Sequence, residues 1–380
     1  MPTVTLETQR SIASLVSSSL AACLTLPFAT TSLGKIDAIQ IPTRTPGDGD
    51  ILIKTSAVAI SLFDTYPVDR AFLVNAYPYI LGFNGAGTVV KVGTGVHDFK
   101  LGDRVVALTM DPVKGKSSQE YITVSRTLCA KIPDSLPFPE AATIPDNFVT
   151  AFYVLFSQLG LPNPSSFPAP TIPLYSNTPI LVYGAGSTVG QYVIQLLQLA
   201  GYTNVIATAS AKHHAYLRSL GATHTFDYNS PSLVEDVTKA AGGKVTLAVD
   251  CVSVKESLAI LGKMVSAPGT VALLLPIKEG STITGNVEEK LYMKLPDDIN
   301  PFSKDIEVFE IKTFLYQEDE VLRENLMPKI LSELLAAGLI KPNKVRLFDQ
   351  GSIRERVEAA LDQLRHNTIK GEKAVVVFET

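Results

Sequence analysis

The sequence contains few cysteines, no excess of basic residues and no long apolar run. Its three cysteines, Cys23, Cys129 and Cys251, stand far apart without the paired spacing of metal sites, which argues against a disulfide framework and favours a reducing, cytoplasmic location. The formal net charge of -4 leaves no basic excess to neutralise phosphates, so nucleic acid is not an expected partner. No segment approaches the roughly 20 apolar residues of a membrane helix, and no membrane association is expected.

The N-terminal part contains one apolar patch, Leu20–Leu24. Glu7 and Arg10 precede it, which is a poor cationic region for a signal peptide, and the patch is too short and too polar to span a bilayer. We therefore expect residues 11–28 to form a first strand of the fold, or a frayed tail that leads into one.

Apolar residues are plentiful: 46% of the 380 residues are hydrophobic and 18% are charged, which suits two domains with a large core. Up to about residue 145 the apolar residues fall in short runs separated by turn-forming residues at 46–49, 93–95 and 101–103. The expected strands are Ile51–Ala59, Gly87–Val92, Arg104–Leu108 and Glu120–Val124. Such spacing predicts a small barrel or sandwich.

From residue 147 onward, helices and strands are expected to alternate. The first helix is predicted over Asn147–Leu159, and six prolines within Leu161–Pro179 then predict a long surface loop, which could equally be a lid or an interaction site. The further expected elements are strands at Ile180–Tyr183, Val205–Ala209, Val245–Asp250, Thr270–Leu275 and Ile306–Thr313, and helices at Gly190–Ala200 and Lys212–Leu220. This alternation predicts a parallel sheet with helices on both faces. The tail is predicted to hold helices Val321–Ala337 and Ser352–Arg365 and a last strand, Lys373–Phe378.

The most specific local signal is a glycine-rich turn between the first predicted strand of the parallel sheet and the helix that follows it. The residues of this turn are Gly184, Ala185, Gly186, Ser187, Thr188, Val189 and Gly190. Their glycine spacing is one residue longer than the usual dinucleotide fingerprint. Glycines let a backbone approach a pyrophosphate, and a helix N-terminus offers N–H groups and the positive end of the helix dipole. We therefore predict that the turn binds a dinucleotide cofactor; the alternative is a tight strand-to-helix turn that needs small residues.

The second strand of the parallel sheet ends without an acidic residue. NAD enzymes usually place an acid there, about 20 residues past the glycines, to hold the ribose 2′-hydroxyl. The corresponding position is Ser210, and Lys212, His213 and His214 follow it. A carboxylate would repel a 2′-phosphate whereas Lys212 would attract it, so the sequence predicts NADPH, with the two histidines adding positive charge. Ser210 is equally suited to cap the next helix, and Lys212 to be an ordinary surface charge.

Three further motifs lie outside this stretch. They are the segment Gly82–Gly87 followed by Gly93 and Val96, the turn Gly102–Val105, and Gly371–Lys373 before the last strand. Together with the glycine turn they resemble the medium-chain dehydrogenase/reductase superfamily from about residue 35 onward. The resemblance implies an α/β protein with a doubly wound parallel Rossmann sheet inserted in a GroES-like β-rich substrate domain. It implies a substrate domain at residues 1–150 and 319–380 and a dinucleotide-binding domain at 151–318, in a monomer or a homodimer.

The residues that bind zinc in many members of the superfamily are replaced here. Positions 83 and 84 are His and Glu in those enzymes but Phe83 and Asn84 in this chain, and Ser61 or a neighbour stands in place of the first zinc cysteine. Three cysteines cannot supply a four-cysteine structural site either, so we expect no metal. The resemblance is to the zinc-free branch, namely quinone oxidoreductases and fungal trans-acting enoyl reductases. In that fungal group the tyrosine corresponding to Tyr228 helps to hold the 2′-phosphate.

Three side chains are candidates for the catalytic site. Tyr66 lies in a stretch similar to one of the quinone oxidoreductases, in which the tyrosine lies near the nicotinamide; it is expected to donate a hydrogen bond to a substrate carbonyl, or to be a half-buried aromatic at a domain edge. Asn84 stands in place of the zinc-associated glutamate, or fixes the turn before Gly85. The resemblance implies that Thr150 touches the nicotinamide amide; alternatively it caps a helix.

The resulting hypothesis is a zinc-independent NADPH-dependent reductase that transfers hydride to a carbonyl-conjugated C=C bond or a quinone, in fungal secondary metabolism. A donor such as Tyr66 would stabilise the developing oxyanion in place of a metal. Two alternatives stay open. The chain could be a trans-acting enoyl reductase that serves a polyketide synthase and takes a carrier-bound acyl substrate. It could also be an NADPH-binding protein with a non-redox role, as isomerase or cyclase, or with a regulatory role.

Overall fold

The computed structural model describes residues 24–110, 116–280 and 289–378, and these group by their contacts into two units. The first unit takes the described parts of Met1–Pro145, Glu320–His366 and Lys373–Thr380, and the second takes those of Asp146–Asp319 and Asn367–Glu372. The second unit is thus inserted in the sequence of the first. It also takes one short segment from near the C-terminus, which the sequence had placed in the substrate domain.

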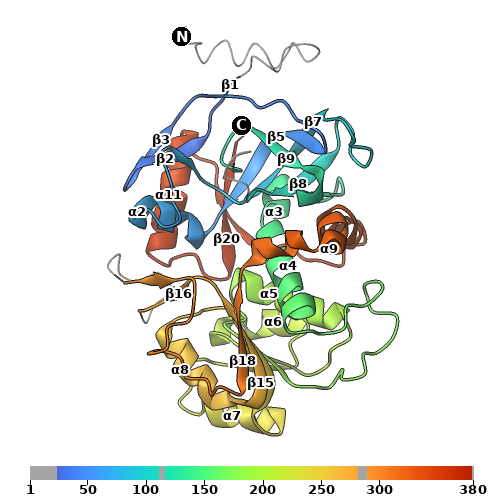
Figure 1. Cartoon of the computed structure of the whole chain (residues 1–380), viewed down its shortest axis with the longest axis vertical. Coiled ribbons are helices and arrows are strands. Elements are labelled where there is room, and N and C mark those ends of the chain that lie inside the picture. Colours follow the sequence, from blue (N-terminus) through green and yellow to red (C-terminus); the bar gives the residue numbers. More distant parts are fainter. Residues whose placement is uncertain (1–23, 111–115, 281–288, 379–380) are drawn as a thin grey trace. The chain divides into compact units, whose positions relative to one another are not determined.

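The second unit is built on a six-stranded parallel sheet (Figure 1). Its strands are β11 (Ile180–Tyr183), β12 (Val205–Thr208), β13 (His224–Phe226), β14 (Val245–Asp250), β15 (Val265–Leu274) and β18 (Ile306–Ile311). Their order is β13-β12-β11-β14-β15-β18, and each neighbouring pair is parallel. This is the doubly wound Rossmann order, which reverses between β11 and β14, and it confirms the predicted fold class.

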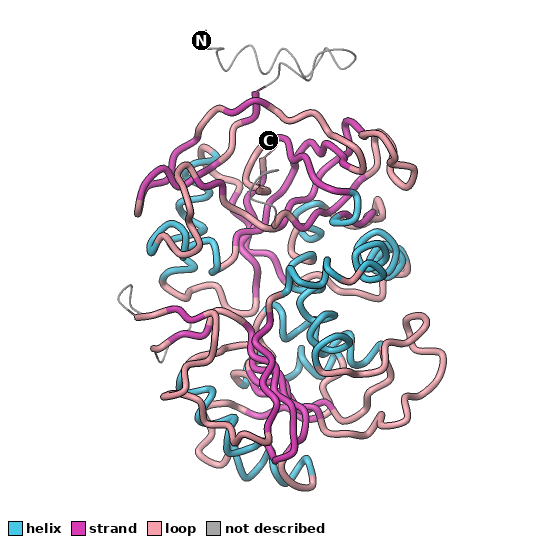
Figure 2. The backbone as a smooth tube through the Cα atoms, viewed as in Figure 1, coloured by secondary structure: helices cyan, strands magenta, loops and turns pink. Residues whose placement is uncertain are grey.

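Helices lie on both faces of this sheet, as the ribbon and the tube show (Figures 1 and 2). They are α5 (Thr188–Leu199), α6 (His214–Leu220) with the preceding turn η5 (Ala211–His213), α7 (Leu233–Ala241) and α8 (Lys255–Met264). Because both faces are covered, β11 is apolar and buried along its whole length. Leu258 of α8 packs in one core cluster with Leu181 and Ile206 of the sheet.

The second unit contains further helical turns, one long loop and a two-stranded ribbon besides the sheet and its covering helices. The predicted helix Asn147–Leu159 is present as α4 (Pro145–Phe152) followed by the π-helical turn η4 (Tyr153–Gln158). Residues 161–179, all of which are described, form no helix or strand, as their prolines predicted. The other elements are η6 (Thr313–Glu318) and a two-stranded ribbon of β16 (Ile277–Lys278) and β17 (Leu291–Tyr292).

The first unit is built on a seven-stranded sheet around β5 (Asp50–Ile60), in which β5 is antiparallel to each of its neighbours. Its other strands are β7 (Asn84–Val92), β8 (Arg104–Leu108), β9 (Tyr121–Ser125), β10 (Cys129–Lys131), β19 (Lys344–Phe348) and β20 (Glu372–Val377). Their order is β10-β8-β7-β5-β20-β19, and β9 also pairs with β5. The four strands predicted between residues 51 and 124 and the predicted last strand are therefore confirmed.

Five shorter strands flank this sheet. They are β1 (Leu24–Thr25), β2 (Phe28–Ser32), β3 (Lys35–Ala38), β4 (Ile41–Pro42) and β6 (Tyr79–Ile80). The strand or tail expected at residues 11–28 lies mostly outside the described residues, which begin with β1.

The helices of the first unit are short except for the last. They are η2 (Leu62–Asp64), α2 (Thr65–Arg70), η3 (Arg126–Leu128), α3 (Phe138–Ala141), α9 (Glu320–Asn325), η7 (Leu326–Leu331), α10 (Ser332–Ala336) and α11 (Ile353–Arg365). The predicted helix Val321–Ala337 is thus interrupted by a π-helical turn, and α11 confirms the second predicted tail helix. No helix in the described ranges combines the length and the apolar composition that crossing a membrane requires.

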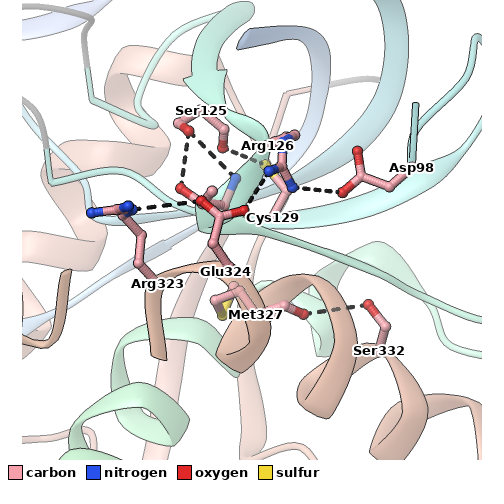
Figure 3. A network of polar contacts seen from close by, with 9 residues as sticks. Asp98, Ser125, Arg126, Cys129, Arg323, Glu324, Met327 and Ser332 are labelled. Carbon is pink, nitrogen blue, oxygen red and sulfur yellow. Dashed lines mark hydrogen bonds and ion pairs between the residues drawn. The ribbon is translucent and has the colours of Figure 1, made fainter. Parts of the chain in front are cut away.

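Polar contacts join the segment after residue 320 to the sheet of the first unit (Figure 3). Arg126 donates to Asp98 at 3.1 Å and also to Glu324 of α9. The backbone N–H of Lys131 donates to the Ser332 hydroxyl at 2.9 Å. These contacts hold together two parts of one unit that the inserted second unit separates in sequence.

Candidate functional site

The carboxyl end of β11 forms a tight glycine turn at the point where the strand order reverses. Gly184 has a φ of 74°, a left-handed conformation that favours glycine, and its N–H donates to Thr208 Oγ1 at 3.1 Å. The N–H of Ala185 donates to the Thr208 carbonyl at 2.9 Å. The end of β12 therefore fixes the shape of the turn.

Helix α5 begins directly after this turn. Ser187 is its N-cap, and the Ser187 Oγ accepts the Gly190 N–H at 3.1 Å. A Cβ on Gly190 would lie 2.7 Å from the Ala185 Cα, so only glycine lets the helix pack this closely on the turn. A Cβ on Gly186 would meet nothing closer than His213 Cδ2 at 3.3 Å. Packing within the protein is therefore a weak reason for glycine at 186, and close approach of a ligand is a better one.

His213 and a segment from near the C-terminus pack beside the glycine turn. A Cβ on Gly371 would lie 2.8 Å from His213 Cε1. The Gln191 Nε2 donates to the Gly186 carbonyl at 3.2 Å and to the Gly371 carbonyl at 3.1 Å. Gln191 thus ties this segment to the turn.

The residues that follow β12 and β13 meet near the start of η5. The Ser210 hydroxyl donates to the Tyr228 hydroxyl at 3.2 Å. Ser210 does occupy the N-cap position of η5, but its side chain makes no capping hydrogen bond there. Tyr228 and Lys212 are both exposed. The Asp227 carboxylate accepts the Asn229 N–H at 2.9 Å, and this bond holds the pKa of Asp227 below its ordinary value. The residues that follow β12 and β13 therefore bring together two hydroxyl groups, those of Ser210 and Tyr228. A cationic side chain, Lys212, and a carboxylate, Asp227, lie next to them in sequence.

A second polar cluster lies at the carboxyl end of β14. Asp250 is fully buried; its Oδ1 accepts the N–H groups of Val252 at 2.8 Å and Ser253 at 3.1 Å, and its Oδ2 accepts the Ser257 hydroxyl at 2.8 Å. Burial raises the pKa of Asp250, while these bonds and Lys278 oppose the rise. Burial lowers the pKa of Lys278 to about 8, against the opposing charge of Asp250.

In the first unit, Tyr66 lies in a cluster of aromatic rings. Its ring centroid is 5.7 Å from that of Phe63 and 6.2 Å from that of Phe72, and Phe63 lies 5.3 Å from Phe83. Tyr66 is 4% exposed, so the alternative of a half-buried aromatic is wrong. Burial raises the pKa of Tyr66 to about 12, against the opposing charge of Arg70.

Asn84 and Thr150 lie inside regular elements. Asn84 is the first residue of β7, is fully buried and pairs with Ala59 of β5. Thr150 lies within α4, and its Oγ1 is 2.9 Å from the Thr313 Oγ1. Asn84 therefore does not fix a turn and Thr150 does not cap a helix. Their roles toward a substrate or cofactor stay predictions.

Phe83, which stands where zinc-dependent relatives are expected to have a histidine, forms a cation–π pair with a lysine. The Lys116 Nζ lies 3.6 Å from the centre of the Phe83 ring. Among the residues that the structure describes, no group of three or more His, Cys, Asp and Glu side chains could hold a metal ion.

All of the predicted cofactor residues lie in the second unit. Those at the glycine turn and its immediate surroundings are Gly184, Gly186, Ser187, Thr188, Val189, Gly190 and His213. Sequence reasoning did not single out Gln191, which donates to the Gly186 carbonyl, or Asp250 and Lys278, which lie beside the turn after β14. The position of Asp250 at the end of a predicted buried strand was an available signal, because ligands bind at the carboxyl ends of parallel strands.

The parallel strand order and the glycine turn at its reversal point define the class of the protein: it is a dinucleotide-binding Rossmann protein joined to a β-rich unit. The turn fits a dinucleotide, since Gly186 carries no side chain beside the turn and α5 begins with its free N–H groups directly after it.

Two family models match the chain: Alcohol dehydrogenase GroES-like domain at residues 47–134 and Zinc-binding dehydrogenase at residues 188–283. The trans-enoyl reductase himH of Aspergillus japonicus is 31% identical over 335 residues, which cover 86% of this chain and 89% of the relative. The chain therefore belongs to the medium-chain dehydrogenase/reductase superfamily, whose enzymes use nicotinamide cofactors, and it is an oxidoreductase.

A second relative agrees with this membership, and a solved structure shares the fold. A trans-enoyl reductase of Gibberella fujikuroi is 31% identical over 361 residues, which cover 91% of this chain and 95% of the relative. The crystal structure of CurK enoyl reductase has a TM-score of 0.72 at 20% identity and covers 93% of this chain and 99% of that protein. At this identity the likeness to CurK supports the fold alone.

Proposed function

We propose that this protein is an NADPH-dependent enoyl reductase that serves a polyketide synthase in trans and reduces a C=C bond conjugated to an acyl carbonyl. The observation that carries the proposal is the 31% identity to the trans-enoyl reductase himH over 86% of the chain. The first unit, with its aromatic cluster, would take the substrate. The second, with its glycine turn, would take the cofactor.

The proposal of NADPH rather than NADH rests on the residues after β12. No carboxylate follows Thr208 at the end of that strand, and the Ser210 and Tyr228 hydroxyls form a pair that would donate to a 2′-phosphate. Lys212 would add a positive charge. Asp227 lies nearby, but hydrogen bonds within its own turn already engage its carboxylate.

When bound, NADPH supplies the hydride. The side chains of this protein would supply orientation and electrostatic stabilisation. Tyr66 is protonated at neutral pH, and its raised pKa of about 12 keeps it so in alkaline solution; its hydroxyl can therefore donate to the carbonyl oxygen on which negative charge develops. Asn84 is proposed to assist from β7, and Thr150 to orient the cofactor amide.

The test is a cofactor titration by fluorescence, with NADH as the control, followed by turnover on a panel of enones, quinones, free enoyl thioesters and enoyl groups on a carrier protein. We expect tighter binding of NADPH than of NADH, and NADPH consumption that is fastest on carrier-bound enoyl thioesters. Turnover on free enones or quinones alone would contradict the role in trans. NADPH binding without any turnover would contradict the reductase.

A further inference from the structure

Gln191 is a buried side chain that bonds to two backbone carbonyls at the glycine turn. It lies in the first turn of α5 and is only 1% exposed. Its Nε2 donates to the Gly186 carbonyl at 3.2 Å and to the Gly371 carbonyl at 3.1 Å, so both N–H groups of one amide are used on backbone oxygens. A buried amide needs such partners, and these two fix the position of the side chain.

The peptide unit between Gly186 and Ser187 is held on both of its sides. The Ser187 N–H donates to the Gly184 carbonyl at 2.9 Å, and the Gly186 carbonyl accepts from Gln191. Because a trans peptide unit is planar and its N–H and C=O point in opposite directions, these two bonds set its orientation. The Gly186 carbonyl oxygen is thereby directed toward the side chain on α5.

The orientation of this carbonyl matters because the glycine turn is proposed to bind an anion. A pyrophosphate binds to backbone N–H groups and to the positive end of a helix dipole. A carbonyl oxygen carries a partial negative charge, so it repels a pyrophosphate that approaches it. A donor that holds the Gly186 carbonyl on the protein side of the turn therefore favours binding of the anion.

The same amide fastens a segment from near the C-terminus, residues 367–372, to the turn. This segment belongs to the second unit. Gly371 has a φ of 70°, and a Cβ on it would lie 3.0 Å from the Gly186 oxygen and 2.8 Å from His213 Cε1. Glycine at 371 thus lets the backbone of the segment lie against the carbonyl that Gln191 holds.

We propose that Gln191 is a positioning residue of the cofactor site: its amide holds the Gly186 carbonyl toward α5 and the segment 367–372 against the turn, so that the turn presents N–H groups to the pyrophosphate. The proposal rests on the cofactor binding put forward under the proposed function, but not on the substrate or the reaction. It assigns Gln191 a part of the affinity that NADPH and NADH share, since both carry the pyrophosphate.

The experiment measures the dissociation constants of NADPH and NADH by fluorescence, on the full chain at neutral pH. Gln191→Met keeps the length of the side chain and removes both donors. We expect it to weaken the binding of both nucleotides by the same factor, about tenfold. Gln198→Met makes the same change at an exposed position of the same helix and should leave both constants unaltered.

A ligand without a pyrophosphate separates a local effect from a general disturbance of the fold. Adenosine 2′-monophosphate is such a ligand, and its binding is measured by competition with NADPH. It should bind Gln191→Met as tightly as the unaltered protein, which also shows that the variant is folded. Equal weakening of adenosine 2′-monophosphate and NADPH would overturn the proposal.

Two further variants test how Gln191 acts. Gln191→Glu keeps the shape of the side chain but replaces its donors by a carboxylate, so it should bind both nucleotides more weakly than Gln191→Met. Gly371→Ala displaces the segment from the Gly186 oxygen and should weaken binding less than Gln191→Met does. The double variant Gln191→Met/Gly371→Ala should lose no more affinity than Gln191→Met alone, because both changes act on one amide.

Four further results would overturn the proposal. They are unchanged affinity in Gln191→Met, weaker binding of NADPH alone, full affinity in Gln191→Glu, and additive losses in the double variant. Full turnover with unchanged affinity in Gln191→Met would refute the role of Gln191 and leave the proposed reaction standing. Nucleotide binding with the expected losses but no turnover on any substrate would do the reverse, and a protein that binds neither nucleotide would refute both.

Discussion

At the scale of single residues, removing the Tyr66 hydroxyl distinguishes a catalytic role of Tyr66 from a role in packing alone. Tyr66→Phe removes only that hydroxyl and keeps the ring that packs on Phe63 and Phe72. If the hydroxyl stabilises the developing oxyanion, kcat should fall by about 10²-fold. The NADPH dissociation constant and the melting temperature should not change. Steady-state kinetics and thermal unfolding of the same preparation check this.

The matched control is Tyr77→Phe, because Tyr77 is 40% exposed and lies in the same unit outside the aromatic cluster. It should leave kcat unaltered. Since burial raises the pKa of Tyr66 to about 12, the kcat of the unaltered protein should show no Tyr66 titration below about pH 11. Equal kcat values in Tyr66→Phe and the unaltered protein would assign Tyr66 to packing alone.

Residue types and spacing predicted the glycine turn well because two of its three glycines meet local steric demands. Gly184 and Gly190 are required by the turn and by the packing of α5. Lys278 could not be predicted, because its burial depends on a two-stranded ribbon that places it beside Ser253. Tyr66 was singled out by resemblance, but its nearly complete burial among aromatic rings follows from tertiary packing.

At the scale of elements, the junction of β11 and α5 allows two glycines to be told apart by experiment. Gly190→Ala places a Cβ 2.7 Å from the Ala185 backbone, so the free energy of unfolding should fall by about 1–3 kcal/mol. In Gly186→Ala the Cβ would lie 3.3 Å from His213 and 3.4 Å from Ala209, so these side chains must shift by only a few tenths of an ångström, and the stability should fall less than in Gly190→Ala. The NADPH affinity of Gly186→Ala should nevertheless fall at least tenfold, because the methyl group occupies the approach of the pyrophosphate.

Denaturant unfolding and NADPH titration of both variants, Gly190→Ala and Gly186→Ala, test these two expectations. Full NADPH affinity in Gly186→Ala would show that the turn is only structural. A destabilisation of Gly186→Ala equal to that of Gly190→Ala would show that His213 cannot give way.

The long elements were predictable because their periodicity or apolar runs are local properties. Arg104–Leu108 and Val245–Asp250 agree with the structure at both ends. The short helix α2, which carries Tyr66, was missed, because six residues with a proline give little helical periodicity. The helix predicted over Val321–Ala337 is interrupted at η7, where Pro328 cannot continue the regular hydrogen-bond pattern.

At the scale of the whole molecule, the first unit is assembled from segments that the second unit separates in sequence. Arg126 and Glu324 are 198 residues apart, and their pair, together with Asp98, joins α9 to the sheet (Figure 3). Because Arg126 and Glu324 are each about one-third exposed or less, solvent screens the pair only in part. Glu324→Gln should therefore lower the free energy of unfolding of the first unit by about 1 kcal/mol, and Asp98→Asn, at the more exposed end, by less than half of that.

We therefore expect a substitution in the first unit to change the unfolding of that unit without changing NADPH binding by the second. Glu324→Gln should lower the melting temperature of the transition that NADPH does not shift, and leave the NADPH dissociation constant unchanged, since NADPH is proposed to bind the second unit alone. Calorimetry with and without NADPH separates the two transitions, and an Arg126→Ala/Glu324→Ala cycle measures the coupling of the pair. A Glu324→Gln variant that weakened NADPH binding as strongly as it lowered stability would show that the units unfold as one.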